Sequence, residues 1–293
     1  MQILLHIGIG KAASTTLQDW FERHPDFWPF SQKALIRGGA RDRKVCVLSD
    51  ERLSIGLEFD ATCGLIAKAD TVREYRESRC SELQSLFPDA YVLIVTRGFA
   101  RFIESFHAQY VSKGGVLPLQ VFLEAYPRAI SDLVDYNHLV EVYRRAFGER
   151  VIVVPVELLS RDAERFYGMI EECLGLASGM RTSGRKLNSR TYSRRLRALP
   201  LFSRAYFRLI RPFSPASKRV IHKFYVRHLA RGWLGSSLAR LVPERFLATV
   251  RVSEGEVSRF RGLASSLAER EVYSEFRPEY LLDDDANCKT VKD

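Results

Sequence analysis

The first eighteen residues, MQILLHIGIGKAASTTLQ, constrain the fold more than any other stretch of the chain. The apolar run Ile3–Ile7 predicts a buried strand, Gly8 and Gly10 end it, and Leu17 with Trp20 begins a helical spacing. Between strand and helix lie a lysine and several hydroxyl groups. A strand, a glycine-containing turn and a helix start together direct backbone N–H groups and a helix dipole at an anion, usually a phosphate.

Strands and helices alternate through the next 160 residues. Further strands are predicted at Lys44–Leu48, Tyr91–Thr96 and Val151–Pro155. Helices are predicted at 14–23, 71–87, 99–110, 119–126, 133–147 and 163–174, and residues 24–43 are predicted to be an irregular connection. This alternation indicates an α/β fold, with an open parallel sheet and helices on both faces.

In such sheets ligands bind beyond the carboxyl ends of the strands. The opening loop, Ser49–Glu51, Arg97 and Glu157 all follow predicted strands, so they are expected at that edge. We expect Glu157 to have a structural role, as a cap or pairing partner.

Strand signals fade after Leu176, which suggests a different organisation. An exposed loop is predicted at 179–190, and then helices interrupted by Pro200, Pro212, Pro215 and Pro243. We therefore expect a nucleotide-binding core at 1–180, a helical region at 181–285 that completes the same domain, and a tail at 286–293.

The positive charge of the chain is concentrated in one segment. The net charge is +10, yet residues 181–231 contain fifteen Lys and Arg and no acid. This indicates either solvated helix faces or an anionic partner, such as a polyanion, a nucleotide or a membrane surface.

Cysteine usage and hydropathy indicate the compartment. Five scattered cysteines without CxxC spacing favour reduced thiols and argue against a zinc site. No signal peptide or membrane-spanning run is recognised, so a cytoplasmic protein is expected.

Three kinds of phosphate loop compete for the opening stretch. A Walker A loop requires Gly-x4-Gly-Lys-Ser/Thr, but Leu5 takes the first glycine position and Ala12 that of the metal-binding hydroxyl. The dinucleotide pattern G-x-G-x-x-A is present at 8–13. However, no second strand ending in an acid follows about twenty residues later.

The third interpretation fits best: HIGIGKAASTTLQ resembles the 5′-phosphosulfate loop of sulfotransferases, HIG-x-x-K-T-G-T-T in bacterial members. On this resemblance Lys11 matches the lysine of the family, and Ser14 and Thr15 match its hydroxyl pair. The sequence departs from the pattern at Ala12-Ala13, where the family has Thr-Gly. The resemblance implies a three-layer, P-loop-like sheet and a donor-binding loop made of Gly10, Lys11, Ala12, Ala13, Ser14, Thr15 and Thr16.

The family also needs a site for the 3′-phosphate of its donor, formed by an arginine at a strand end and a serine eight residues later. Here YVLIVTRGFARFIESF supplies Arg97 and Ser105, and arginine grips phosphate bidentately. GRKLNSR at 184–190 resembles the late loop that closes over the nucleotide, so Arg185 and Lys186 are further candidates. The resemblance covers residues 1–190.

The resemblance implies transfer of a sulfuryl group from 3′-phosphoadenosine 5′-phosphosulfate (PAPS), without a metal, to a hydroxyl or less favourably an amine. The acceptor would be a carbohydrate or another small molecule. Lys11 would stabilise the bridging oxygen of the donor. Glu51 is the first choice as general base, with Asp50, Glu22 and His107 as alternatives. His6, inside the first strand, is expected to be a core residue.

Two other functions remain as alternatives. One is an ATP-dependent P-loop kinase, against which the missing metal hydroxyl argues. The other is a non-catalytic protein that binds nucleotides or nucleic acid through 181–231, although that segment contains no known recognition motif. Specific nucleic-acid binding is therefore not expected.

Overall fold

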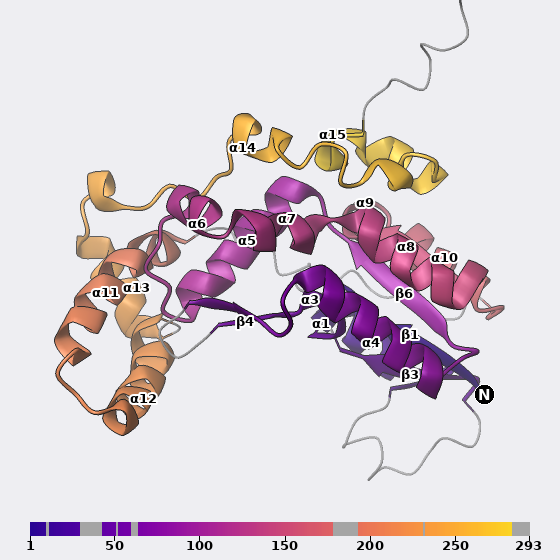
Figure 1. The fold of residues 1–293 in the computed structure, drawn as a ribbon, viewed down its shortest axis with the longest axis horizontal. Coiled ribbons are helices and arrows are strands. Elements are labelled where there is room, and N and C mark those ends of the chain that lie inside the picture. Colours follow the sequence, from indigo (N-terminus) through magenta and orange to yellow (C-terminus); the bar gives the residue numbers. More distant parts are fainter. Residues whose placement is uncertain are drawn as a thin grey trace, which may run out of the picture.

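The computed structural model describes residues 1–9, 12–29, 43–50, 52–59, 64–177, 193–230 and 232–282. Within them, a parallel sheet has helices on both faces, and a helical region follows it in the chain (Figure 1). This confirms the α/β fold class and the helical C-terminal region that the sequence predicts.

Five parallel strands form the main sheet in the order β2-β3-β1-β6-β7. Their bounds are β1 Gln2–His6, β2 Phe27–Pro29, β3 Val45–Ser49, β6 Tyr91–Thr96 and β7 Val151–Pro155. In the central strand β1, His6 is paired with Ser49 of β3 and with Leu93 of β6. From β1 the chain goes to β2 and β3 on one side of the sheet. It then passes β1 and forms β6 on the other side. The topological switch point, where open α/β sheets bind ligands, is therefore beside β1.

The helices form a layer on each face because crossover connections in opposite directions place their helices on opposite sides. Helices α1 (Ser14–Arg23) and α10 (Ala163–Cys173) lie together, with the rings of Trp20 and Tyr167 4.5 Å apart. On the other face, α4 (Val72–Leu86) packs against α8 (Tyr136–Phe147), where Gln84 Nε2 donates to the Ala146 carbonyl at 2.9 Å.

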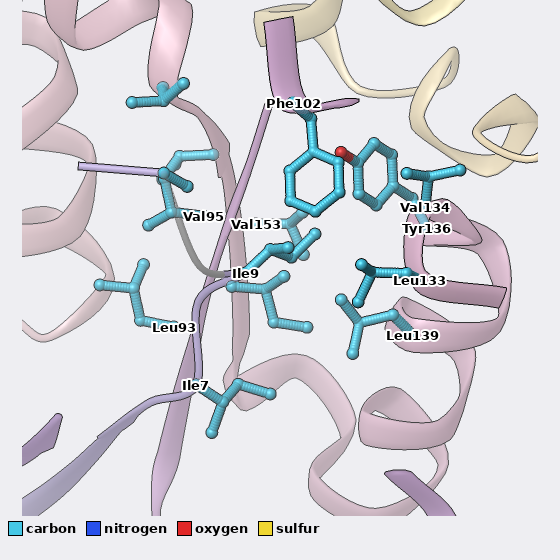
Figure 2. Close-up of a cluster of buried hydrophobic side chains, with 14 of the residues drawn as sticks. Ile7, Ile9, Leu93, Val95, Phe102, Leu133, Val134, Tyr136, Leu139 and Val153 are labelled. Carbon is cyan, nitrogen blue, oxygen red and sulfur yellow. The ribbon is translucent and has the colours of Figure 1, made fainter. Parts of the chain in front are cut away.

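The hydrophobic core extends to the segment that follows β1. Figure 2 shows Ile7 and Ile9 among side chains of β6, β7, α7 and α8, including Val95 and Leu133. Both isoleucines are fully buried. The start of the predicted phosphate loop is thus attached to the core on its apolar side.

Shorter elements connect these layers. They are α3 Arg52–Ile55, β4 Leu57–Phe59, β5 Leu65–Ala67, α5 Phe99–Ser112, α6 Leu119–Ala125, α7 Pro127–Val134, the 3₁₀ turn η1 Gly148–Arg150 and α9 Val156–Arg161. Strands β4 and β5 form a separate antiparallel hairpin. Three elements, α1, β6 and β7, have the bounds predicted for them, 14–23, 91–96 and 151–155.

Two predictions about the first part of the chain are wrong. The connection 24–43 contains an edge strand, β2, whose three residues pair with β3. The helix predicted over 133–147 is interrupted at Asp135. There, the carboxylate of Asp135 accepts the His138 N–H at 2.9 Å and caps α8, and an N-cap residue has non-helical backbone angles.

The C-terminal region is helical, as predicted. Its elements are α11 Arg194–Ile210, α12 Pro215–Phe224, the π-helix η2 Tyr225–Ala230, α13 Trp233–Leu241, η3 Glu244–Phe246, α14 Glu254–Ser258, η4 Ser265–Leu267, η5 Glu271–Phe276 and α15 Arg277–Tyr280. Pro200 does not break a helix, contrary to the prediction, but lies buried inside α11. The burial of the apolar face of α11 offsets the roughly 3 kcal/mol cost of an interior proline.

Figure 1 shows α11, α12 and α13 gathered at one end of the molecule, while α14 and α15 run back along the sheet domain. No described helix combines the length and apolar character needed to cross a bilayer. The predicted loop 179–190 and the tail from Asp283 lie outside the described residues. Cys46, Cys80 and Cys173 are free thiols, and Cys63 and Cys288 also lie outside the described part.

Candidate functional site

The candidate site lies at the carboxyl end of β1. After this strand Ile7 N–H still donates to the Leu93 carbonyl of β6 at 3.1 Å, and Ala12 N–H donates to the Ile9 carbonyl at 3.1 Å. Ala12 is fully buried. The residues on either side of Gly10 and Lys11 are thus held by backbone hydrogen bonds and by burial. Gly10 and Lys11 themselves lie outside the described residues.

Ala13 has an unusual backbone conformation. Its φ of 59° and ψ of 23° place it in the left-handed region, at the N-cap of α1. The methyl group of alanine makes this region unfavourable by roughly 1–2 kcal/mol, a cost that glycine avoids. This is the position at which the resembled loop has glycine. The chain therefore makes a left-handed turn with alanine and accepts local strain at its candidate site.

Replacing Ala13 by Gly is expected to raise the free energy of unfolding by about 0.5–1 kcal/mol, because relief of strain exceeds the greater flexibility of glycine when unfolded. Denaturant unfolding measures this change. Ala12→Gly is the matched control, since residue 12 does not have a positive φ, and it should destabilise the protein. Equal destabilisation by the two substitutions would contradict a strained Ala13.

The start of α1 has hydroxyl groups but no capping side chain. Ala13 provides no side-chain cap, the first turn contains no acid, and the Ala13 carbonyl accepts the N–H groups of Thr16 and Leu17. Ser14 is 8 % exposed and Thr15 is exposed. The first turn of α1 thus supplies no acid to offset the helix dipole, which favours an anion at this end.

The segment after β3 lies against the same loop. Asp50 N–H donates to the His6 carbonyl at 3.1 Å, and Ser54 Oγ donates to the Gly8 carbonyl at 3.2 Å. The segment after β3 is therefore tied both to the end of β1 and to the start of the loop that follows it. Glu51, the first choice as base, lies outside the described residues, while its neighbour Asp50 is half-buried beside the end of β1.

A buried arginine that sequence analysis did not single out supports this arrangement. The guanidinium of Arg76 is fully buried and donates to the carbonyl oxygens of Ser54 (2.9 Å), Asp132 (2.7 Å) and Leu133 (2.8 Å). Burial lowers the pKa of Arg76 to about 10, and the carboxylate of Asp135 opposes this shift. Arg76 thus remains charged at neutral pH and fixes the backbone of Ser54, which in turn holds Gly8.

Arg97 follows β6, the strand next to β1, as predicted. The hydroxyl of Tyr136 donates to its carbonyl oxygen. Loss of water contact lowers the pKa of Arg97; the carboxylate of Glu157 raises it and the charge of Arg101 lowers it. Arg101 lies one helical turn further along α5 and is exposed, so two guanidinium groups share this corner of the sheet edge.

Glu157 has the structural role expected for it. Its Oε1 accepts the Gly98 N–H at 3.0 Å, and its Oε2 accepts the Tyr280 hydroxyl at 2.8 Å. The carboxylate thereby ties the turn after β6 to the C-terminal region.

The C-terminal segment closes over this turn. Thr96 Oγ1 lies 2.6 Å from the Tyr273 hydroxyl and 2.9 Å from that of Tyr280. A Cβ atom at Gly98 would approach the Cβ of Glu279 to 2.7 Å, so this position accepts only glycine without rearrangement. Contacts across about 180 residues therefore shape the turn that presents Arg97, and no local pattern in the sequence predicts them.

Ser105 lies two turns along α5 from Arg97 and is half-buried. Its neighbour Glu104 accepts the Val252 N–H at 3.3 Å. Burial raises the pKa of Glu104, while this hydrogen bond and then Arg251, Arg101 and Arg97 lower it. Arg251 and Arg101 are thus additional positive charges near the predicted 3′-phosphate position. Arg251 could not be predicted from the sequence, because it lies far along the chain from Arg97. Arg101 could have been predicted, because it is spaced one helical turn from Arg97.

The other proposed bases are less well placed. Burial lowers the pKa of His107 to about 4, its Nε2 donates to the Leu117 carbonyl at 3.0 Å, and its ring packs against those of Tyr110 and Phe122. Glu22 is exposed on α1. His6 is a core residue, as expected, because it is fully buried and its Nδ1 lies 2.7 Å from Ser49 Oγ.

Arg185 and Lys186 lie outside the described residues. Among the residues that the structure describes, no three His, Cys, Asp or Glu side chains gather as metal ligands. The described edge therefore brings together the loop after β1, the segment after β3 and Arg97, but it leaves Lys11 and Glu51 to be tested by experiment.

Comparison with known proteins gave only structural likenesses. No protein-family model matches the chain, and no curated protein matches it. A sulfotransferase from Alicyclobacillus acidocaldarius is similar in structure, with a TM-score of 0.48, 16 % identity, and coverage of 75 % of this chain and 99 % of the other. The mouse sulfotransferase SULT7A1 complexed with PAP has a TM-score of 0.38 and 14 % identity, and the match covers 82 % of this chain and 87 % of the other. Likenesses this weak do not establish the family.

Proposed function

We propose that this chain is a sulfotransferase that takes PAPS as its donor and transfers the sulfuryl group to a hydroxyl group of a small acceptor, such as a carbohydrate. The observation that carries the proposal is the juxtaposition, at one switch point, of a helix start and an arginine, two features that suit anions. The uncapped start of α1 follows β1, and Arg97 follows the adjacent strand β6. A nucleotide with phosphates at both its 5′ and 3′ positions suits such a pair of corners.

The 5′-phosphosulfate would occupy the loop of residues 10–16. There, the hydroxyl groups of Ser14 and Thr15, the backbone of Ala12 and Ala13, and Thr16 in the first turn would bind the phosphate. The 3′-phosphate would bind Arg97 and Ser105, with Arg185 and Lys186 as additional partners. Arg101 and Arg251 would strengthen the positive potential there.

The reaction forms a bond between the acceptor oxygen and sulfur and breaks the bond between sulfur and the bridging oxygen of the donor. The leaving 5′-phosphate gains negative charge, and Lys11 would stabilise it at the bridging oxygen. The acceptor proton would pass to Glu51. Asp50 is the alternative base because it lies at the end of β1, and rates of Glu51→Gln and Asp50→Asn would distinguish the two. The products are the sulfated acceptor and the donor without its sulfuryl group, 3′-phosphoadenosine 5′-phosphate (PAP).

Arg97→Ala tests the assignment of the 3′-phosphate corner. It should weaken binding of PAP by about 10–100-fold, the usual value of a charge-assisted hydrogen bond. Binding of adenosine 5′-phosphate, which lacks the 3′-phosphate, should not change. Calorimetric titration of both ligands measures the two affinities.

Arg150→Ala provides the control. Arg150 precedes β7, so it lies at the amino ends of the strands, away from the candidate site, and its Nη2 donates to the Pro88 carbonyl at 2.9 Å. It should leave both affinities unchanged. Thermal unfolding of each variant should be compared with the unsubstituted protein. An equal loss for the two nucleotides in Arg97→Ala would contradict the assignment.

A further inference from the structure

Large apolar side chains are exposed on the helical lobe formed by α11, α12, η2, α13 and η3. Twelve such side chains are exposed in the described part of the chain, and eight of them fall between residues 209 and 246. They are Leu209, Phe213, Val220, Phe224, Trp233, Leu238, Leu241 and Phe246. Isolated exposed apolar residues are ordinary, but such a concentration marks an interaction surface.

The packing of the lobe holds these side chains outward. Val220 and Phe224, 69 % and 62 % exposed, are one turn apart on α12. The adjoining Tyr225 is buried, with its ring 4.2 Å from that of Tyr206 and its hydroxyl 2.7 Å from Ser203 Oγ. Because this buried contact fixes the helix on α11, Val220 and Phe224 cannot turn inward without breaking it.

The same arrangement recurs on α13. Trp233 and Leu241, 73 % and 79 % exposed, are two turns apart, while Gly235 and Ala239 on the opposite side are buried. Leu209 and Phe213 lie at the end of α11 and in the turn that leads to α12. Figure 1 shows the three helices together at the end of the molecule away from α10.

The lobe is also strongly basic. Residues 194–246 contain thirteen Lys and Arg and one acid, Glu244. Glu244 is paired with Arg194 at 2.9 Å and also with Arg197. Lys223 and Arg227, which are exposed, lie beside Val220 and Phe224. Apolar and cationic groups therefore share the solvent side of α12 and η2.

We propose that this lobe docks the protein on the surface of an anionic lipid bilayer. Helices with exposed Trp, Phe and Leu beside Lys and Arg lie in the membrane interface, where the acyl region takes the apolar groups and the headgroups take the charge. A nucleic acid or an acidic glycan would pair with the arginines, but it would not remove the apolar side chains of Leu209, Val220 and Leu241 from water. A second copy of this chain would place two strongly positive faces against each other.

The test is cosedimentation of the full chain with vesicles. One set contains phosphatidylcholine alone, and the other also contains about 30 % phosphatidylserine, to give a negative surface. The protein should bind the anionic vesicles and not the neutral ones. The double variant Val220→Ser/Phe224→Ser should bind at least about tenfold more weakly. Lys223→Gln should weaken binding roughly fivefold.

Leu86→Ser is the matched control, because Leu86 is 69 % exposed but lies at the end of α4 in the sheet domain. It should bind the vesicles like the unsubstituted protein. Because the substituted side chains are exposed, all variants should keep the unfolding midpoint and the PAP affinity of the parent. The docking test therefore does not depend on the proposed activity.

Three results would overturn the proposal. The first is the absence of binding to anionic vesicles. The second is binding that Val220→Ser/Phe224→Ser leaves unchanged, which would reduce the effect to charge attraction alone. The third is a dimer, detected by light scattering, that the same double variant dissociates; the exposed residues would then form an interface between copies.

Discussion

Replacing Lys11 by Ala is expected to lower the turnover number for sulfuryl transfer by about 10²–10³-fold, the usual cost of removing one donor to a developing negative charge. The lysine is assigned to the bridging oxygen, where charge appears only as the bond to sulfur breaks. The Lys11→Ala substitution should therefore lower the rate much more than the affinity for PAP, because PAP has no bond to sulfur. Steady-state rates and calorimetric titration together separate the two effects.

Lys44→Ala serves as the control for this experiment. Lys44 directly precedes β3, at the amino edge of the sheet, and its Nζ pairs with Asp26 at 3.2 Å. Its substitution should change neither rate nor affinity. If Lys11→Ala turns over normally once it is saturated with donor, the role given to Lys11 is wrong.

The second large effect concerns stability. Arg76→Met should lower the free energy of unfolding by about 3–5 kcal/mol, because each buried acceptor left without a donor costs about 1–3 kcal/mol. Methionine has a similar length and is apolar, so it removes the hydrogen bonds to Ser54, Asp132 and Leu133 while it fills much of the space.

Arg79→Met is a matched comparison on the same helix. The Arg79 side chain is 34 % exposed, and it pairs with the carboxylate of Glu82, which is 52 % exposed. Ion pairs at the surface contribute about 0–1 kcal/mol, so this variant should unfold almost like the parent in denaturant. A loss below 1 kcal/mol for Arg76→Met would show that its hydrogen bonds do not support the segment behind the loop.

Strong local patterns explain which elements the sequence predicted. The run YVLIVT forms β6 over the predicted residues, because a strand buried on both faces is continuously apolar. β2 was missed because a three-residue edge strand has no periodicity of its own, and its pairing partner Val45 lies eighteen residues away. The prediction of a helix break at Pro200 is wrong because the packing of α11 outweighs the tendency of proline to end a helix.

The same distinction applies to the candidate site. Arg97 follows β6 and Ser105 lies on α5, as expected from the resemblance, because one strand and the helix after it determine both positions. Their part in binding a phosphate stays a prediction. The contacts of Glu157 with Gly98 and Tyr280 join distant segments, and only the fold brings them together. Ala13 could be predicted only in part. The sequence shows alanine where the resembled loop has glycine, but only the structure shows the positive φ that makes alanine unfavourable there.

The most direct test of the proposed function is a calorimetric titration of the unsubstituted protein with PAP and with ATP plus Mg²⁺. We expect PAP to bind with a dissociation constant on the order of micromolar, with the same affinity in the presence of EDTA, and ATP with Mg²⁺ to bind much more weakly. Tighter binding of ATP with Mg²⁺, or PAP binding that requires the metal, would contradict the assignment of a sulfuryl-donor site.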